Sequence, residues 1–320
     1  MDNGDLFKGQ PDTYRKEIWA VGGGKGGTGK TFLAANLGLC LTKLGKRVLL
    51  VDADLGCANL HTALGIAPPS ATLSDCIRGK ARSIKEVLIE TGIPNLSLIS
   101  GAQDFLEIAN PKYTEKMRLI RQIQELDFDN IILDLGAGTS FNILDFFLIS
   151  DHGILAVIPE PTCIENVYRF IKSAFYRKFK KVVKDPQIRE IITLAMDQKN
   201  QLAIRTPHDL IDQVSLINSS VGGRLKEAMV RFTPKLIVNQ VRTKDDIALG
   251  FSMRSSCSKY FGIQVEYPGY IEYDDSVWQS TKKKRPLLLE FPYSLSARCL
   301  ERVTYNLLKQ EQLNFDLVIR

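Results

Sequence analysis

A glycine-rich segment near the start of the chain carries residue types that bind nucleotide phosphates. Residues 24–31 read Gly-Lys-Gly-Gly-Thr-Gly-Lys-Thr and fit the pattern GxxxxGK[ST]. Glycines let backbone N–H groups curl around phosphate oxygens, Lys30 can reach the β- and γ-phosphates, and the Thr31 hydroxyl can ligate Mg²⁺. We therefore predict a nucleotide-binding set made of Gly24, Gly26, Gly27, Thr28, Gly29, Lys30, Thr31 and Phe32.

Two acidic segments supply further groups that phosphoryl transfer requires. Asp52 and Asp54 end an apolar run, and residues two apart on a strand project to the same side. Carboxylates that close need a cation or a polar substrate to offset their repulsion. Asp134 ends another apolar run, and the glycines after it, including Gly138, allow the backbone to approach a γ-phosphate. The pattern predicts a Mg²⁺ and phosphate site.

The elements that must position these residues alternate between strands and helices. The glycine-rich segment lies between a predicted strand at 17–21 and a predicted helix at 30–44, which Gly45 ends. Continuous apolar runs, typical of strands buried on both faces, recur farther along the chain at 47–52, 96–99, 131–134, 153–158 and 235–239. The fold class expected is α/β: a doubly wound, mostly parallel sheet with helices on both faces, as in P-loop NTPases.

One stretch is too long for this scheme. Residues 166–234 contain no predicted strand, and their apolar residues recur only at helical intervals. Since one crossover helix suffices between two parallel strands, we predict a helical insertion at about 184–234. We expect a single domain over 1–320, with a polar leader at 1–16 and a tail at 313–320.

Composition narrows the class of protein. The chain has 320 residues, 44% of them hydrophobic, and a net charge of +6, which excludes collagen-like, disordered and disulfide-scaffold proteins. Its six cysteines are scattered singly, which argues against a zinc or iron–sulfur site. No uncharged apolar run approaches the roughly 20 residues of a membrane helix. We expect a cytoplasmic protein.

The glycine-rich segment also contains a second lysine, and with it the sequence resembles a known family. Residues 25–31, Lys-Gly-Gly-Thr-Gly-Lys-Thr, resemble the deviant Walker A loop of MinD, ParA and FlhG ATPases, closest to the MinD/FlhG branch. In that family the extra lysine reaches the partner's phosphates in a nucleotide-sandwich dimer. The resemblance thus implies an ATP-dependent homodimer in which Lys25 acts across the interface.

The acidic segments resemble the two switch regions of the same family. Residues 52–60 resemble the first switch, which implies that Asp54 positions the attacking water and Asp52 supports the Mg²⁺ shell. Residues 131–138 resemble the second switch, which implies that Asp134 supports Mg²⁺ and that Gly138 approaches the nucleotide. The implied catalytic residues are Lys25, Lys30 and Asp54, and the implied metal-site residues are Thr31, Asp52 and Asp134.

Other matches concern the base and the architecture. Asn239 matches the family position that recognises adenine, which implies ATP rather than GTP, although a plain strand-end asparagine is the alternative. Thr162, after a Pro-Glu-Pro segment, is expected to cap the next helix. The resemblance covers about 17–165 and 235–310, and residues 184–234 match nothing in it.

The resemblance implies a Mg-ATP-dependent switch that positions a division site, a flagellum or another polar assembly, and that an activating protein partner stimulates. Three alternatives remain: a ParA-like DNA-partitioning ATPase, a nucleotide-dependent ligase of the dethiobiotin synthetase type, and a scaffold that does not hydrolyse nucleotide. Lys25 and the pair Asp52 and Asp54 favour the positioning ATPases.

Two surfaces suggest what such a switch acts on. Residues 169–184 carry seven basic and no acidic side chains, with Phe170, Phe175, Tyr176 and Phe179 interleaved. A basic amphipathic helix can lie on an anionic membrane or follow DNA phosphates. The alternative is that its aromatics pack into the core and its charges are solvated. The apolar tail at 313–320 gives a second hypothesis of reversible association with the inner face of the cell membrane.

Overall fold

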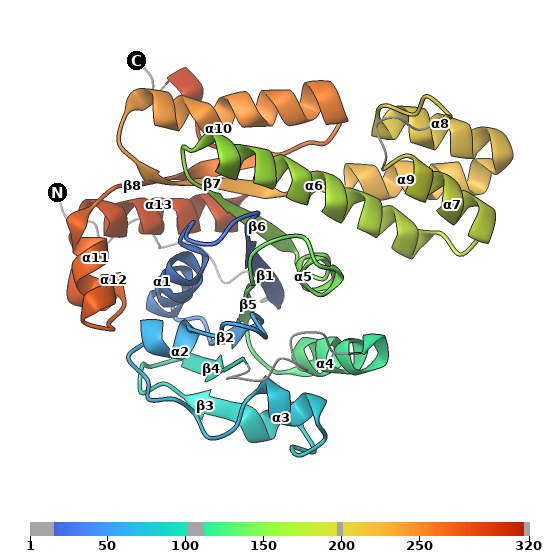
Figure 1. Cartoon of the computed structure of the whole chain (residues 1–320). Coiled ribbons are helices and arrows are strands. Elements are labelled where there is room, and N and C mark those ends of the chain that lie inside the picture. Colours follow the sequence, from blue (N-terminus) through green and yellow to red (C-terminus); the bar gives the residue numbers. More distant parts are fainter. Residues whose placement is uncertain (1–15, 102–111, 197–200, 317–320) are drawn as a thin grey trace.

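The computed structural model describes residues 16–101, 112–196 and 201–316. Its strands form one sheet in the order β3-β4-β2-β5-β1-β6-β7-β8 (Figure 1). Neighbouring strands are parallel except for β3, which pairs antiparallel with β4. The strands are β1 (Glu17–Gly22), β2 (Val48–Asp52), β3 (Leu88–Glu90), β4 (Leu96–Ile99), β5 (Asn130–Asp134), β6 (His152–Val157), β7 (Lys235–Val241) and β8 (Glu266–Glu272).

Helices cover both faces of this sheet (Figure 1). The strand order explains why helices lie on both faces. The chain runs from β1 to β2 in one direction along the sheet, and from β5, β6 and β7 to the next strands in the other direction. Right-handed crossovers in opposite directions lie on opposite faces. One face carries α1 (Lys30–Lys43), α2 (Leu60–Ala63), α11 (Asp275–Lys282), α12 (Leu287–Glu290) and α13 (Leu295–Lys309). The other carries α4 (Tyr113–Glu125), α5 (Phe141–Phe147), α6 (Pro161–Val182) and α10 (Lys244–Ser256). The predicted doubly wound α/β fold is confirmed.

Two strands were not predicted from the sequence. Strand β8 contains Pro268 and Gly269, a pair of residues that normally indicates a turn. Strand β3 has only three residues and lies at the sheet edge next to the short helices α3 (Leu73–Ile77) and η2 (Ile84–Val87). The six predicted strands are all present, because each is buried on both faces and therefore reads as a continuous apolar run.

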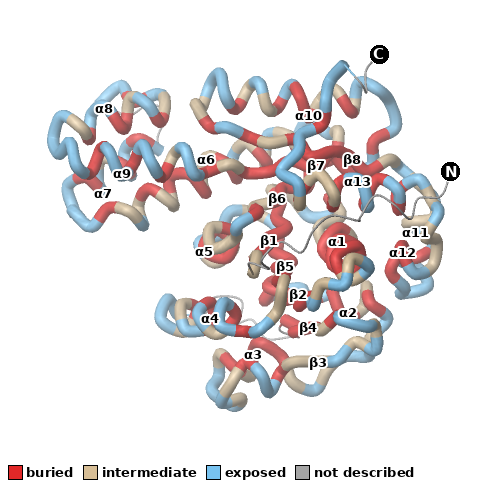
Figure 2. Tube along the Cα trace, turned by 180° about the vertical axis from the view of Figure 1, so that it is seen from behind, coloured by how far each residue is buried: buried red, intermediate tan, exposed pale blue. Residues whose placement is uncertain are grey.

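Helix α1 fixes the glycine-rich segment to the core. Residues 33–41 are buried without interruption, and α1 appears red along its length in Figure 2. The sheet lies on one side of α1, while α2, α12 and α13 enclose the others. Gly45, just after the C-cap residue Leu44, adopts φ 79°, the left-handed conformation expected where this helix ends.

Three helices extend beyond the sheet between α6 and β7 (Figure 1). They are α7 (Pro186–Leu194), α8 (Pro207–Ile217) and α9 (Ser219–Val230). Side chains cap each of them, since Asp185, Thr206 and Asn218 accept hydrogen bonds from the first-turn N–H groups. The helical character predicted for 184–234 is therefore confirmed for its described residues, while the single-domain organisation stays a prediction.

Helix α6 corrects two sequence-based interpretations. Its N-cap residue is Glu160, not Thr162, because Pro161 takes the first helical position, where a missing N–H costs nothing. The four aromatic side chains of its 169–184 segment, Phe170, Phe175, Tyr176 and Phe179, are buried in the core. The amphipathic surface helix is thus wrong for the aromatic face, and the packed alternative is confirmed for these aromatic side chains.

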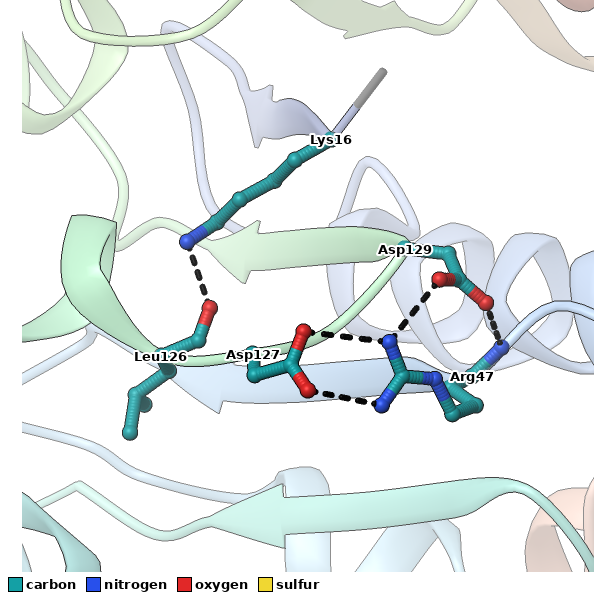
Figure 3. A network of polar contacts seen from close by, with 5 residues as sticks. All are labelled: Lys16, Arg47, Leu126, Asp127 and Asp129. Atoms are coloured by element: carbon teal, nitrogen blue, oxygen red, sulfur yellow. Dashed lines mark hydrogen bonds and ion pairs between the residues drawn. The ribbon is translucent and has the colours of Figure 1, made fainter. Parts of the chain in front are cut away.

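Ion pairs and hydrogen bonds connect neighbouring segments at the amino ends of the strands (Figure 3). Arg47 donates to both carboxylate oxygens of Asp127, at 3.0 and 3.1 Å, and to Asp129 at 3.1 Å. Lys16 donates to the backbone carbonyl of Leu126 just after α4. The carboxyl ends of the parallel strands remain for the functional residues.

The chain after α13 returns to the sheet. The Leu313 N–H donates to the Tyr267 carbonyl at 2.9 Å, and the Phe315 ring packs edge-on against Phe251 with centroids 5.0 Å apart. The anchor predicted at 313–320 is therefore partly docked on the protein, and residues 317–320 lie outside the described part. Among the described residues, no helix is long and apolar enough to cross a membrane.

Candidate nucleotide-binding and hydrolysis site

The glycine-rich loop runs from the end of β1 to the start of α1. Gly27 and Gly29 adopt φ values of 80° and 88°, which favour glycine. A Cβ at Gly24 would overlap the backbone of Asn166 on α6, and one at Gly29 would overlap the Asn239 amide. The loop therefore needs glycine at these positions, both for its curvature and for the close approach of neighbouring elements.

Asn239 lies directly beneath this loop. Its side chain is buried, and its Nδ2 donates to the Thr28 carbonyl at 2.9 Å. Its Oδ1 accepts from the N–H of Gln240, which adopts φ 59°. These bonds show Asn239 shaping the loop, and its predicted recognition of adenine stays a prediction.

Lys30 points back over the loop. Its Nζ donates to the Lys25 carbonyl at 3.2 Å, across the space that the loop encircles. Burial lowers the pKa of Lys30, and the carboxylates of Asp134 and Asp54 oppose that shift. A partly desolvated ammonium in this position interacts strongly with a phosphate oxygen.

Asp52 and Asp134 form a buried acidic pair. They are register partners on the adjacent strands β2 and β5, and both are almost fully inaccessible to solvent. Burial raises the pKa of both carboxyls, and their mutual repulsion raises that of Asp134 further. Asp52 also accepts from the N–H groups of Asp54 and Leu60, at 3.2 and 2.9 Å, so it holds the loop between β2 and α2.

The residues present fit a divalent cation at this pair. The Asp134 Oδ1 atom is buried and has no hydrogen-bond partner among the described residues, and the same holds for Thr28 Oγ1 in the loop. Thr31 and Lys30 lie close enough to Asp134 to favour its charged form. The described residues contain no cluster of three or more side chains that could hold a metal by themselves. The carboxylate and hydroxyl oxygens of Asp52, Asp134 and Thr31 suit Mg²⁺, which usually combines one or two protein ligands with phosphates and water.

Asp54 lies between the two predicted switch loops. Its Oδ1 accepts from the N–H groups of Gly56 and Cys57 at 3.2 and 3.1 Å, which fixes the carboxylate. A Cβ at Gly136 would lie 3.1 Å from the Asp54 carboxyl carbon, so the second loop passes directly over this group. Asp54 is only partly buried, unlike Asp52 and Asp134.

Gly138 connects the second loop to the glycine-rich loop. Its N–H donates to the Gly23 carbonyl at 3.2 Å, and its φ of 96° is one that glycine adopts readily. A Cβ added there would meet no atom within 4 Å, so the loop faces open space. Its backbone can therefore approach a phosphate placed in the glycine-rich loop.

Lys25 is held differently from the other site residues. Its Nζ forms an ion pair with Glu160 at 3.0 Å, and the two side chains are 41% and 52% exposed. The pair lies at the surface, at the start of α6. Sequence reasoning treated Glu160 as architecture and missed this contact, which joins residues 135 positions apart.

A second cluster was missed altogether. Asp145, on the helix that follows the second switch, is fully buried and contacts Lys116 of α4 together with Arg177 and Lys181 of α6. Three cations outweigh the cost of burial and hold the pKa of Asp145 far below its usual range. No spacing in the sequence indicates this cluster, because its members lie on three separate helices.

The remaining predicted residue, Phe32, borders a cavity of about 290 Å³ together with Thr31. The first switch contributes Asn59 to its walls, α2 contributes Thr62, and the segment between α11 and α12 contributes Arg285. The structure thus brings the whole predicted set to the carboxyl ends of β1, β2, β5 and β7, where open α/β sheets bind ligands.

Comparison with protein families matches residues 16–217 to the family described as AAA domain, AAA_31. The antiactivator FleN of Pseudomonas aeruginosa is 26% identical over 290 residues, which are 90% of this chain and 84% of FleN. The septum site-determining protein MinD of Synechocystis sp. is 34% identical over 156 residues, 48% of this chain and 58% of that protein.

Solved structures share the fold. MinD of Pyrococcus horikoshii, complexed with Mg-ADP, superposes with a TM-score of 0.62 at 21% identity and covers 92% of this chain and 97% of its own. A ParA family ATPase of Chlorobium tepidum superposes with a TM-score of 0.61 at 18% identity, over 91% of this chain and 99% of its own.

Proposed function

Because the chain belongs to the MinD/ParA family of P-loop ATPases, we propose that it is a Mg-ATP-dependent switch that dimerises around its nucleotide and positions a cellular structure. The observation that carries this proposal is the convergence of Asp54, the buried Asp52–Asp134 pair and Lys30 around one glycine-rich loop. Such a set serves hydrolysis as well as binding.

In this proposal the loop N–H groups and the α1 N-terminus bind the phosphates, and Lys30 exchanges its bond to the Lys25 carbonyl for phosphate oxygens. Thr31, Asp134 and Asp52 would hold Mg²⁺ directly or through water. The bound ion would neutralise charge on the β- and γ-phosphates. Asp54, fixed by the N–H groups of Gly56 and Cys57, accepts a hydrogen bond from water and directs its lone pair toward the phosphate.

Lys25 completes the site from a second copy. The Lys25 side chain lies at the surface and pairs with Glu160, so its ammonium group is not in the space that its own loop encircles. Dimerisation exchanges that partner for the neighbour's phosphates, which places a cation where negative charge develops during transfer. The preference for adenine rests on the family position that Asn239 matches, because its side chain here binds the loop backbone.

The positioning role rests on the relatives. FleN is an antiactivator, MinD determines septum sites, and a MinC:MinD complex from Aquifex aeolicus is among the solved structures with this fold. We therefore propose a protein partner that reads the nucleotide state, and a cytoplasmic location with reversible membrane contact. Because a ParA family ATPase shares the fold, DNA is the second candidate for the surface on which the switch acts. Salt-sensitive binding to duplex DNA in the presence of ATP would identify it.

The test is hydrolysis by the Asp54→Ala variant. We expect phosphate release to fall by about 10²-fold or more, with nucleotide binding retained, because Asp54 acts on water and not on the nucleotide. Asp212→Ala, at an exposed acid on α8, is the matched control and should hydrolyse at the wild-type rate. An undiminished rate in Asp54→Ala contradicts its role, and phosphate release that requires a small-molecule acceptor would identify a ligase.

A further inference from the structure

The segment around α11 and α12 exposes an unusual combination of side chains. Of the fifteen large hydrophobic side chains exposed in the described part, five lie between residues 273 and 295. They include Trp278, at 64% exposure, and Tyr293, at 85%. Four consecutive basic residues, 282–285, lie between them and are also exposed.

We call the exposed residues of this segment the α11–α12 basic patch: Trp278, residues 282–285, Tyr293 and Leu295. Contacts within the segment place its basic side chains beside aromatic rings and an acid. The Lys282 ammonium lies 5.1 Å from the Trp278 ring centroid, and Lys283 lies 5.3 Å from the ring of Phe291. Glu290 pairs with Lys283 and Arg285, at 2.6 and 3.0 Å, and neutralises one of the four charges. Residues 282–290 thus keep a net charge of 4 − 1 = +3.

We propose that the α11–α12 basic patch binds the surface of an anionic lipid bilayer. Lysines interact with acidic headgroups while tryptophan and tyrosine rings settle at the interface between headgroups and acyl chains. Exposed Leu289 and Leu295 add aliphatic surface, which a bilayer buries and a nucleic-acid backbone does not. The proposed membrane surface is additional to the proposed ATPase switch. It rests on that proposed function only for the expected difference between ATP and ADP.

The patch is also connected to the nucleotide site. A Cβ at Gly65, just after α2, would overlap the Lys284 carbonyl, so the turn after α2 packs on the basic loop, and α2 itself follows the first switch. Arg285 and Thr281 border the cavity that Thr31 and Thr62 share. A dimer presents two such patches, and two weak sites on one rigid body bind a bilayer much more tightly than one.

The chain provides a direct probe, because it has two tryptophans and the other, Trp19, is fully buried. The full chain should co-sediment with vesicles of phosphatidylglycerol and phosphatidylcholine in a non-hydrolysable ATP analogue, less in ADP, and not with pure phosphatidylcholine. On binding, Trp278 emission should shift to shorter wavelength.

A pair of charge reversals tests the position of the site. Lys282→Glu with Lys284→Glu should weaken vesicle binding by about tenfold or more. Lys180→Glu with Lys184→Glu makes the same change in charge at the end of α6 and just after it, and should bind like the wild type. Nucleotide hydrolysis by each variant serves as the folding control, and it also separates failure of this inference from failure of the proposed ATPase.

Three results overturn the proposal: no vesicle binding, binding with unchanged tryptophan emission, or equal losses in the two double variants. Duplex DNA binding that the 282/284 variant loses, without vesicle binding, assigns the patch to nucleic acid instead.

Discussion

At the scale of single residues, the site depends on glycines as much as on charged groups. Gly136 allows the second switch to pass over Asp54, and Gly29 allows Asn239 to support the loop from below. The sequence predicted the phosphate-binding and acidic residues because motif spacing encodes them. It could not predict that Glu160 pairs with Lys25, since that contact joins residues 135 positions apart.

Gly136→Ala tests whether the approach of the two switches matters for hydrolysis. The added Cβ would lie 3.1 Å from the Asp54 carboxyl carbon, a distance that forces the carboxylate or the loop to shift. We expect the hydrolysis rate to fall by about tenfold or more, since small misplacements of catalytic groups are costly, while nucleotide affinity is nearly unchanged. Gly223→Ala, on α9 with open space around it, is the control. A wild-type rate in Gly136→Ala argues against this contact.

At the scale of elements, helices α4, α5 and α6 are joined by a buried charge cluster. Asp145 of α5 binds Arg177 through two bonds of 3.0 and 2.9 Å, and it also contacts Lys116 and Lys181. Helix α5 begins at Phe141, and its N-cap residue Ser140 lies just after the second switch. Two basic residues of the predicted surface patch at 169–184, Arg177 and Lys181, therefore pair with a buried acid. Counting the charges of the sequence could not reveal this pairing.

Asp145→Asn should destabilise the fold strongly. Removing one partner from a buried ionic cluster leaves cations unpaired and typically costs about 3–5 kcal/mol of unfolding free energy. Asp127→Asn, in the exposed pair with Arg47, is the matched control and should destabilise the fold far less, because solvent screens that pair. Urea denaturation of both variants measures the difference, and equal losses contradict the importance of the cluster.

The same cluster predicts a pH dependence. Its cations hold the pKa of Asp145 below the unfolded value of about 3.9, so the stabilisation is complete above that pH and declines as the pH falls below it. The stability difference between the wild type and Asp145→Asn should therefore shrink in acid. A difference that stays constant below that pH would mean that the carboxylate charge is not the cause.

At the scale of the whole molecule, the sequence predicted the fold class because parallel strands buried on both faces are legible as apolar runs. The edge strands β3 and β8 do not read as continuous apolar runs, so they were missed. We propose that the molecule is half of a working unit, in which Lys25, at the surface and paired with Glu160, serves a second copy. That claim follows from the family resemblance and from the lysine's position at the surface.

Mixing two inactive variants tests the central claim most directly. Lys25→Ala keeps its own Asp54, and Asp54→Ala keeps its own Lys25, so a heterodimer contains one complete site only if Lys25 acts across the interface. Random pairing of equal amounts then predicts about a quarter of the wild-type hydrolysis rate, because half of the dimers are mixed and each has one working site of two. If Lys25 acts within its own chain, no site in the mixture is complete, and hydrolysis will stay at the level of the separate variants.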